Sequence, residues 1–149
     1  MQDLYLFMSF YYLLDLKRCD SESSWTIHGL WPQYSPTHWP QWCNQSDHLS
    51  NQTLEHFPDL STIWTSCEGP TQDYHFWAHE WSKHGTCSQM DQITYFNTTI
   101  NLYHTFQDAC WTRTPVTHPV FYQECQITVI IPWDPRSEEH AITSPLVPP

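Results

Sequence analysis

The sequence is poor in positive charge. Five lysines and arginines stand against 16 aspartates and glutamates in 149 residues, which gives a formal net charge of -11 at pH 7. Such acidity argues against a broad basic face for nucleic acid. Ten histidines change this in acid, because adding their ten positive charges to -11 leaves only -1 before any carboxylate is neutralised. A polyanionic ligand would therefore be approached most readily in mildly acidic solution.

Long apolar runs are also absent. The apolar stretch over residues 4–14 is too short to span a membrane. It lacks the preceding basic residue and the following small-residue cleavage site of a secretory signal peptide, so we interpret it as the first strand of a sheet. From residue 132 onward proline, serine and charged residues dominate. We expect one folded domain over residues 1–131 and a disordered, Pro-rich tail over residues 132–149.

Paired Cys-x-x-Cys motifs, which are typical of zinc and redox sites, do not occur. Six scattered cysteines instead predict disulfides and an oxidising compartment, and the sequence alone leaves about fifteen pairings open. Three Asn-x-Ser/Thr sequons strengthen the prediction of a glycoprotein that is secreted or lysosomal/vacuolar. The acceptor asparagines are Asn44, Asn51 and Asn97.

The segment HEWSKHGTC, residues 79–87, concentrates groups that carry protons. On a helix Glu80 and His84 share one face, while His79 and Lys83 form a second pair rotated by about 100°. These four groups could surround one small anion. An earlier segment, WTIHGLWP at residues 25–32, supplies a further histidine, His28, that could act as an acid on the other side of a reacting atom.

A zinc protease motif is the sharpest alternative for a His-Glu pair close to another histidine. That motif needs two histidines one helical turn apart. His79 and His84 are five residues apart and would diverge by about 140° on a helix. The spacing therefore argues against a metal.

Together the two segments resemble the paired signature of the ribonuclease T2 family of acid endoribonucleases. Residues 76–87, FWAHEWSKHGTC, match along their whole length, and the WTIHGLWP segment precedes them in the expected order. The resemblance extends from about residue 19 to about residue 106. It implies an enzyme that cleaves RNA through a 2′,3′-cyclic phosphate without cofactor or metal. The scarcity of basic residues favours single strands as the substrate, and we expect a monomer that does not bind a membrane. A bell-shaped, mildly acidic pH profile is expected, because one catalytic histidine must be protonated while the other can still accept a proton.

The resemblance also implies roles for individual residues. His28 would protonate the leaving oxygen, His84 would take the proton of the ribose 2′-hydroxyl, and Glu80 with Lys83 would steady the phosphorane. His79 would hold the phosphate. Three further residues would contact bases: Trp31 by stacking, with Gln33 and Tyr34 as weaker candidates. The implied disulfides are Cys43 with Cys87, Cys19 with Cys67, and Cys110 with Cys125.

The expected fold class is a single α+β domain in which helices pack on an antiparallel sheet. Besides the N-terminal strand, we expect strands at residues 25–30, 121–122 and 127–131, and a loop over residues 32–47. A short helix should precede Pro58. The active-site helix should begin near Asp73, which can cap it, and end before Gly85, and another helix should cover residues 92–108.

Two alternatives stay open at this point. The nine tryptophans could belong to a secreted glycan-binding module, because indole faces stack well on sugars. That interpretation leaves the cluster of His79, Glu80, Lys83 and His84 without a purpose. The other alternative is a catalytically impaired member of the same fold.

Overall fold

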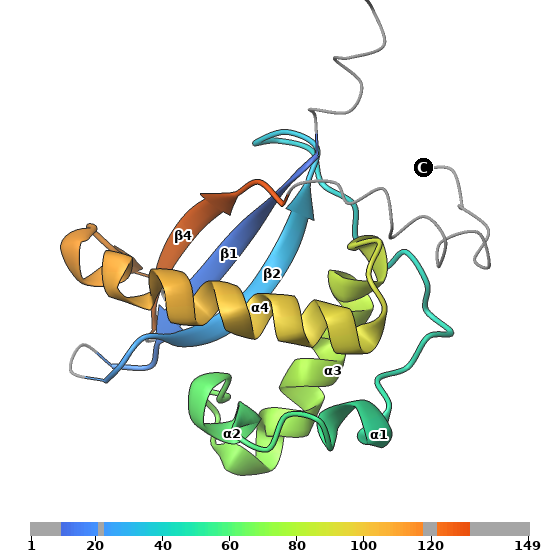
Figure 1. The fold of residues 1–149 in the computed structure, drawn as a ribbon. Coiled ribbons are helices and arrows are strands. Elements are labelled where there is room, and N and C mark those ends of the chain that lie inside the picture. The colour runs from blue at the N-terminus through green and yellow to red at the C-terminus, as the bar shows by residue number, and fades with distance from the viewer. Residues whose placement is uncertain (1–9, 21–22, 118–121, 132–149) are drawn as a thin grey trace, which may run out of the picture.

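A four-stranded antiparallel sheet forms the centre of the protein (Figure 1). The computed structural model describes residues 10–20, 23–117 and 122–131. The strand order is β2-β1-β4-β3. The strands are β1 (Tyr11–Arg18), β2 (Thr26–Gln33), β3 (Val116–Thr117) and β4 (Gln123–Val129). The predicted α+β class with an antiparallel sheet is therefore confirmed, while the expected tail, residues 132–149, lies outside the described residues.

Three strand boundaries differ from the prediction. β1 begins at Tyr11 and runs to Arg18, whereas the prediction placed the strand over residues 4–14, most of which lie outside the described residues. β2 continues through Pro32 and Gln33, because both residues pair with the start of β1. β4 begins at Gln123 and ends at Val129, so it overlaps the strand expected at residues 127–131 but starts four residues earlier. In the strand expected at residues 121–122, Tyr122 is not in a strand and residue 121 lies outside the described residues.

The two faces of the sheet have opposite character. Alternate residues of β1 and β4 point to opposite sides. Leu14 and Leu16 of β1, with Ile127 of β4, are buried on the apolar face. Asp15 and Glu124 lie on the other face, and both are also buried. The strands therefore carry a hydrophobic core on one side and a buried polar cluster on the other.

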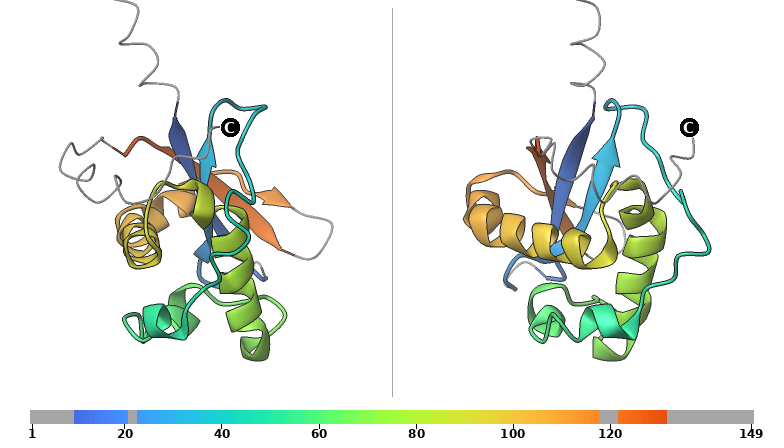
Figure 2. Two further views of the ribbon diagram at one scale, coloured as in Figure 1. Left: turned by 90° about the vertical axis from the view of Figure 1, so that its right-hand side faces the viewer. Right: turned by 45° about the vertical axis from the view of Figure 1, so that its right-hand side comes forward.

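Helix α4 (Gln92–Phe106) covers the apolar face (Figures 1 and 2). Asp91 caps it, since its side chain accepts a hydrogen bond from the Thr94 N–H. Tyr95 and Tyr103 turn towards the sheet. The Tyr95 hydroxyl donates to the Leu30 carbonyl within β2, and the Tyr103 hydroxyl donates to the Trp25 carbonyl just before β2. The predicted helix over residues 92–108 is thus confirmed except for its last residues, which form a 3-10 turn, η3 (Gln107–Thr112).

Helix α3 (Asp73–Lys83) lies beside β2 (Figure 2). It begins and ends where the sequence predicted, but Asp73 does not cap it. A 3-10 turn, η1 (Pro70–Gln72), leads directly into the helix, so Asp73 is already a helical residue. Its carboxylate accepts a hydrogen bond from the Ser66 N–H and fixes the preceding loop. Beyond α3 the chain continues into the short turn η2 (Gly85–Cys87).

Two short helices and three disulfides complete the frame. The helices are α1 (Asn51–Leu54), the one expected before Pro58, and α2 (Leu60–Ile63). The disulfides join the cysteine pairs that the resemblance implied: Cys19 with Cys67, Cys43 with Cys87, and Cys110 with Cys125. Among the described residues, no helix combines the length and the apolar character needed to cross a bilayer.

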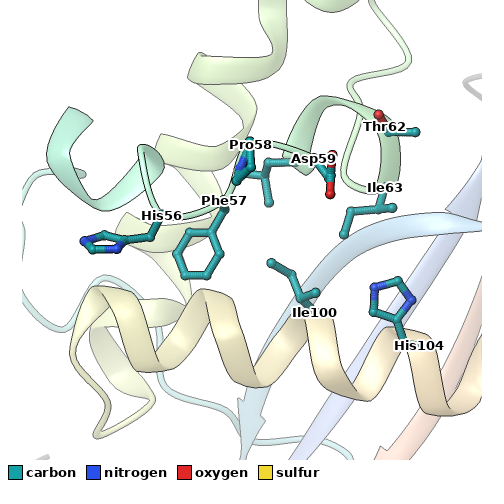
Figure 3. A pocket seen from close by; sticks show the side chains of 9 residues that line it. His56, Phe57, Pro58, Asp59, Thr62, Ile63, Ile100 and His104 are labelled. Atoms are coloured by element: carbon teal, nitrogen blue, oxygen red, sulfur yellow. The ribbon is translucent and has the colours of Figure 1, made fainter.

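A hollow of about 330 Å³ opens between α2 and α4 (Figure 3). Its walls are mainly apolar, and His56 and His104 stand at its rim. None of the predicted site residues lines it.

Candidate active site

An irregularity in the sheet aims His28 at the polar cluster. In the pairing of β1 with β2, Asp15 lies opposite Gly29 while the next residue, Leu16, lies opposite Ile27. His28 is therefore the extra residue of a β-bulge, a feature that reorients side chains and often occurs next to active sites. In a regular strand residues 28 and 31 would point to opposite faces. Here their rings lie 5.0 Å apart, measured between centroids.

Gly29 lets α3 approach β2 closely. A Cβ atom at this position would overlap Glu80 Oε2, and it would come within 2.5 Å of Trp31 Nε1. With hydrogen there instead, the indole N–H of Trp31 donates to Glu80 Oε2 at 2.9 Å. Glu80 is 2% exposed, so its carboxyl group is held against the strand away from bulk water.

Both candidate histidines meet at this one carboxyl group. His28 Nε2 lies 3.4 Å from Glu80 Oε1, and His84 Nε2 lies 3.9 Å from Glu80 Oε2. The His84 ring also stacks on Trp31, with 5.0 Å between centroids and 24° between planes. His84 Nδ1 is buried and has no hydrogen-bond partner among the described residues. The structure thus brings His28 and Trp31 of β2 together with Glu80 of α3 and His84 at the end of α3.

His79 and Lys83 lie on the flank of α3, as the helical spacing predicted. The His79 ring contacts Trp42, with 5.4 Å between centroids, and the Lys83 carbonyl accepts a hydrogen bond from the Trp42 N–H. The neighbouring disulfide between Cys43 and Cys87 ties this loop to the end of the helix. Burial lowers the pKa of His79, and the positive charges of Lys83 and His28 lower it further.

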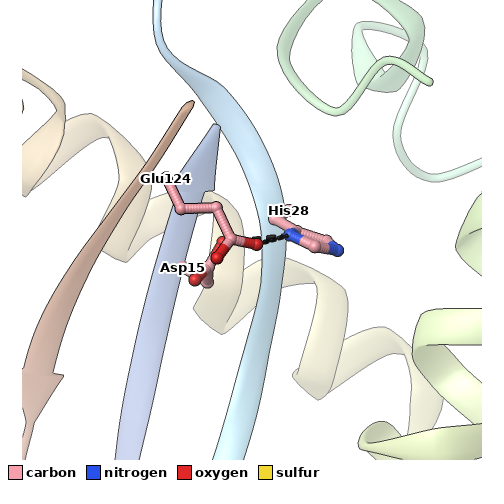
Figure 4. Close-up of side chains that lie close together, drawn as sticks. All are labelled: Asp15, His28 and Glu124. Carbon is pink, nitrogen blue, oxygen red and sulfur yellow. Dashed lines mark hydrogen bonds and ion pairs between the residues drawn. The ribbon is translucent and has the colours of Figure 1, made fainter. Parts of the chain in front are cut away.

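Asp15 and Glu124, which the sequence analysis did not identify as site residues, complete the site. His28 Nδ1 lies 3.0 Å from Asp15 Oδ1 and 2.8 Å from Glu124 Oε1 (Figure 4). Burial lowers the pKa of His28, but the hydrogen bonds with these carboxylates and the charge of Glu80 outweigh it and raise the pKa to about 10. In the sequence, Asp15 could have been recognised as a candidate because it is a charged residue within the apolar stretch YYLLDL.

The other histidine is pushed in the opposite direction. Burial lowers the pKa of His84 to about 3, assisted by the charges of Lys83, His79 and His28. Burial also raises the pKa of Glu80 to about 7, against the opposing effect of His28. Near neutrality His28 is therefore an imidazolium and His84 a neutral imidazole. Groups whose environments separate their pKa values in this way suit paired acid and base roles.

The two weaker base-binding candidates differ in exposure. Gln33 is 5% exposed at the end of β2. Tyr34 is 38% exposed, but its ring packs against Phe10 and His38. Trp31 is engaged by His84 on one face and by His28 edge-on. The base-binding roles of all three residues stay predictions.

Within the described part of the chain, one group of side chains could share a metal ion: Asp15, His28 and Glu124, whose donor atoms lie within 4.8 Å of one another. Their separations of 2.8 and 3.0 Å from His28 Nδ1 are hydrogen-bond lengths. A proton on His28 accounts for this arrangement, and we assign no metal to it.

The chain belongs to the ribonuclease T2 family, whose model matches residues 6–125. It is 39% identical over 113 residues to ribonuclease DdI of Dictyostelium discoideum, an alignment that covers 70% of this chain and 50% of that protein. It is 42% identical over 85 residues to intracellular ribonuclease LX of Solanum lycopersicum, covering 54% and 35%. The chain thus spans half or less of these curated relatives.

The fold agrees with this assignment. The crystal structure of ribonuclease MC1 from the seeds of bitter gourd matches with a TM-score of 0.63 and 19% identity over 80% of this chain and 88% of that one. At this identity the likeness concerns the fold. It supports the α+β assignment made from the strands and helices above.

Proposed function

We propose that the protein is an endoribonuclease that cleaves single-stranded RNA by transphosphorylation. One observation carries the proposal: two imidazoles with opposite protonation states meet at the carboxyl group of Glu80. A reaction that removes one proton and delivers another at the same phosphorus atom needs such a pair. Membership of the ribonuclease T2 family supports this assignment.

The reaction begins at the ribose. His84 takes the proton of the 2′-hydroxyl, and the 2′-oxygen forms a bond to phosphorus. The bond from phosphorus to the 5′-oxygen of the next nucleotide breaks, and the proton on His28 Nε2 passes to that oxygen. The products are a 2′,3′-cyclic phosphate and a free 5′-hydroxyl. Because His84 is neutral and His28 is charged in the free protein, both groups start in the required state.

Three neighbours stabilise the charge on the phosphoryl oxygens. Lys83 contributes a cation and His79 a further ring on the same flank of α3. Below a pH of about 7 the Glu80 carboxyl group is neutral and donates a hydrogen bond to a phosphoryl oxygen. The activity should therefore be greatest in mildly acidic solution and decline as Glu80 loses its proton.

The substrate is a flexible single strand. The chain carries only five lysines and arginines, so it contacts few phosphates. Structures of RNase NT with 5′-AMP and of an RNase MC1 mutant with 5′-UMP show nucleotides bound by proteins of similar fold. By analogy, Trp31, Gln33 and Tyr34 contact the bases here. The protein acts as a monomer, without a metal or a membrane.

The protein is secreted or resides in a lysosome or vacuole. Three disulfides support an oxidising compartment, and the sequon residues Asn44, Asn51 and Asn97 are all exposed. Expression with a signal peptide in a eukaryotic cell should yield secreted protein whose mass falls after glycosidase treatment. Unmodified protein from that expression would contradict the glycosylation.

The alternatives make different predictions in one assay. A single-stranded oligoribonucleotide is incubated with the protein at pH 5 in EDTA, and the products are analysed by mass spectrometry. We expect cyclic-phosphate ends, and losses of about 10²- to 10⁴-fold in His28→Ala and His84→Ala. His56→Ala, a change at the exposed hollow, should cleave normally. Folded wild-type protein without cleavage would refute the proposal in favour of an impaired member of the family.

A further inference from the structure

His28 Nδ1 faces two carboxylates rather than one. Glu124 Oε1 and Asp15 Oδ1 lie 2.8 and 3.0 Å from the same nitrogen, and Figure 4 shows both side chains converging on it from neighbouring strands. Asp15 is completely buried and Glu124 is 6% exposed. Two buried acids beside one imidazole are costly to assemble unless the imidazole carries a charge.

The sheet holds this group in place. Asp15 lies opposite Gln126 across β1 and β4, and the Gln126 side chain donates to Asp15 Oδ2 at 3.0 Å. Glu124 precedes Cys125, whose disulfide with Cys110 anchors β4 to η3. The β-bulge then turns His28 towards both acids. Three strands thus fix one ring, and its remaining nitrogen, Nε2, is left facing Glu80.

We propose that Asp15 and Glu124 are positioning residues of the cleavage reaction, which together orient the His28 ring and keep its proton in place up to alkaline pH. The inference rests on the proposed function, because it concerns the group that protonates the leaving oxygen. Neither carboxylate needs to touch RNA. They act through Nδ1, and Nε2 delivers the proton.

The charges around His28 come from every element packed against it. The carboxylates of Asp15 on β1, Glu124 on β4 and Glu80 on α3 stabilise the charged form of His28. The charged forms of His79 and His84 repel it. The rings of Trp31, Phe76 and Tyr122 contact the imidazole and leave 17% of the His28 side chain exposed. One acid compensates for the partial burial of the ring. The second acid holds the proton beyond the range of an ordinary histidine.

The two carboxylates share one hydrogen-bond donor, the Nδ1–H of His28. One proton cannot be donated fully to two oxygens, so each carboxylate serves as a partial acceptor and as a nearby negative charge. Removing one acid should leave the ring oriented by the other. Removing both should release the ring and let it lose its proton near or below the usual range for histidine.

The test uses Asp15→Asn, Glu124→Gln and the double variant, which keep side-chain size and remove charge. Exposed Glu55→Gln is the matched control. NMR titration of the His28 ring should give a pKa near 10 in the wild type, falling by about 1–3 units in each single variant and further in the double variant. Thermal unfolding verifies the fold of each protein, and Glu124→Gln, at the less buried site, is measured even if Asp15→Asn unfolds.

Cleavage of a dinucleoside monophosphate provides the second readout. Relative to wild type at the same pH, the double variant should lose activity at pH 5, where the ring is no longer oriented, and lose about 10- to 100-fold more at pH 8, where its His28 is also neutral. An unshifted His28 titration, or an equal loss at both pH values, would overturn the proposal. A shifted titration in a protein that cleaves no RNA would uphold the pairing and refute the proposed function instead.

Discussion

Replacing Gly29 with alanine should separate the acid-base cluster without removing any of its members. The added methyl group overlaps Glu80 Oε2 and crowds Trp31 Nε1, so α3 and β2 must move apart or the two side chains must leave their positions. Overpacking of this kind costs about 1–3 kcal/mol. Losing the hydrogen bond between Trp31 and Glu80 adds about 1–3 kcal/mol.

Activity should fall further than stability alone explains. A displacement of Glu80 by about 1 Å from the two histidines is expected to lower kcat by about 100-fold. Denaturant unfolding measures the loss of stability, and cleavage of a defined oligoribonucleotide at pH 5 measures the loss of kcat under conditions where the variant is still folded.

Gly69→Ala is the matched control. Gly69 has a φ of 104° and nothing within 4 Å of the position of a Cβ atom. Alanine there is strained by about 1–3 kcal/mol but touches no part of the site, so stability should fall while kcat stays at the wild-type level. If Gly29→Ala cleaves RNA as fast as Gly69→Ala, the placement of Glu80 against β2 has no part in the reaction.

Three further predictions concern charge, metal and disulfides. Because the pKa of His28 is raised to about 10, its contribution to stability should be full below its ordinary value of about 6.5 and should vanish as the pH rises through 10; the difference in unfolding free energy between wild type and His28→Asn should shrink over that interval, and a constant difference would contradict the shift. EDTA should leave the cleavage rate unchanged, whereas loss of activity that zinc restores would establish a metal requirement. Replacing both Cys110 and Cys125 with alanine should lower the unfolding free energy by about 3 kcal/mol and reduce cleavage more at pH 8 than at pH 5, because the disulfide holds the strand that carries Glu124; equal losses at both pH values would separate the disulfide from His28.

The sequence predicted those parts of the site that lie on one continuous segment. Helical spacing places Glu80 and His84 on one face and His79 with Lys83 beside them, since local geometry alone determines that arrangement. The family resemblance supplied His28. Helices α3 and α4 were predicted for the same reason, from periodicity and flanking residues that act locally.

Features that depend on pairing between distant strands could not be predicted in this way. Asp15 and Glu124 converge on His28 only because β1, β2 and β4 are neighbours in one register. The β-bulge that turns His28 depends on a shift in pairing with β1, which no local pattern reveals. Gln33 was placed in a loop, yet pairing with Tyr11 extends β2 to include it.

In the proposed reaction His28 and His84 act on one phosphorus atom from opposite sides. A crystal structure with an oligonucleotide that carries 2′-deoxyribose at the cleavage position tests it most directly, because that strand binds but cannot react. We expect His28 Nε2 within hydrogen-bond distance of the 5′-oxygen and His84 Nε2 beside the position of the missing 2′-hydroxyl. A phosphate bound to only one of the two rings would contradict it.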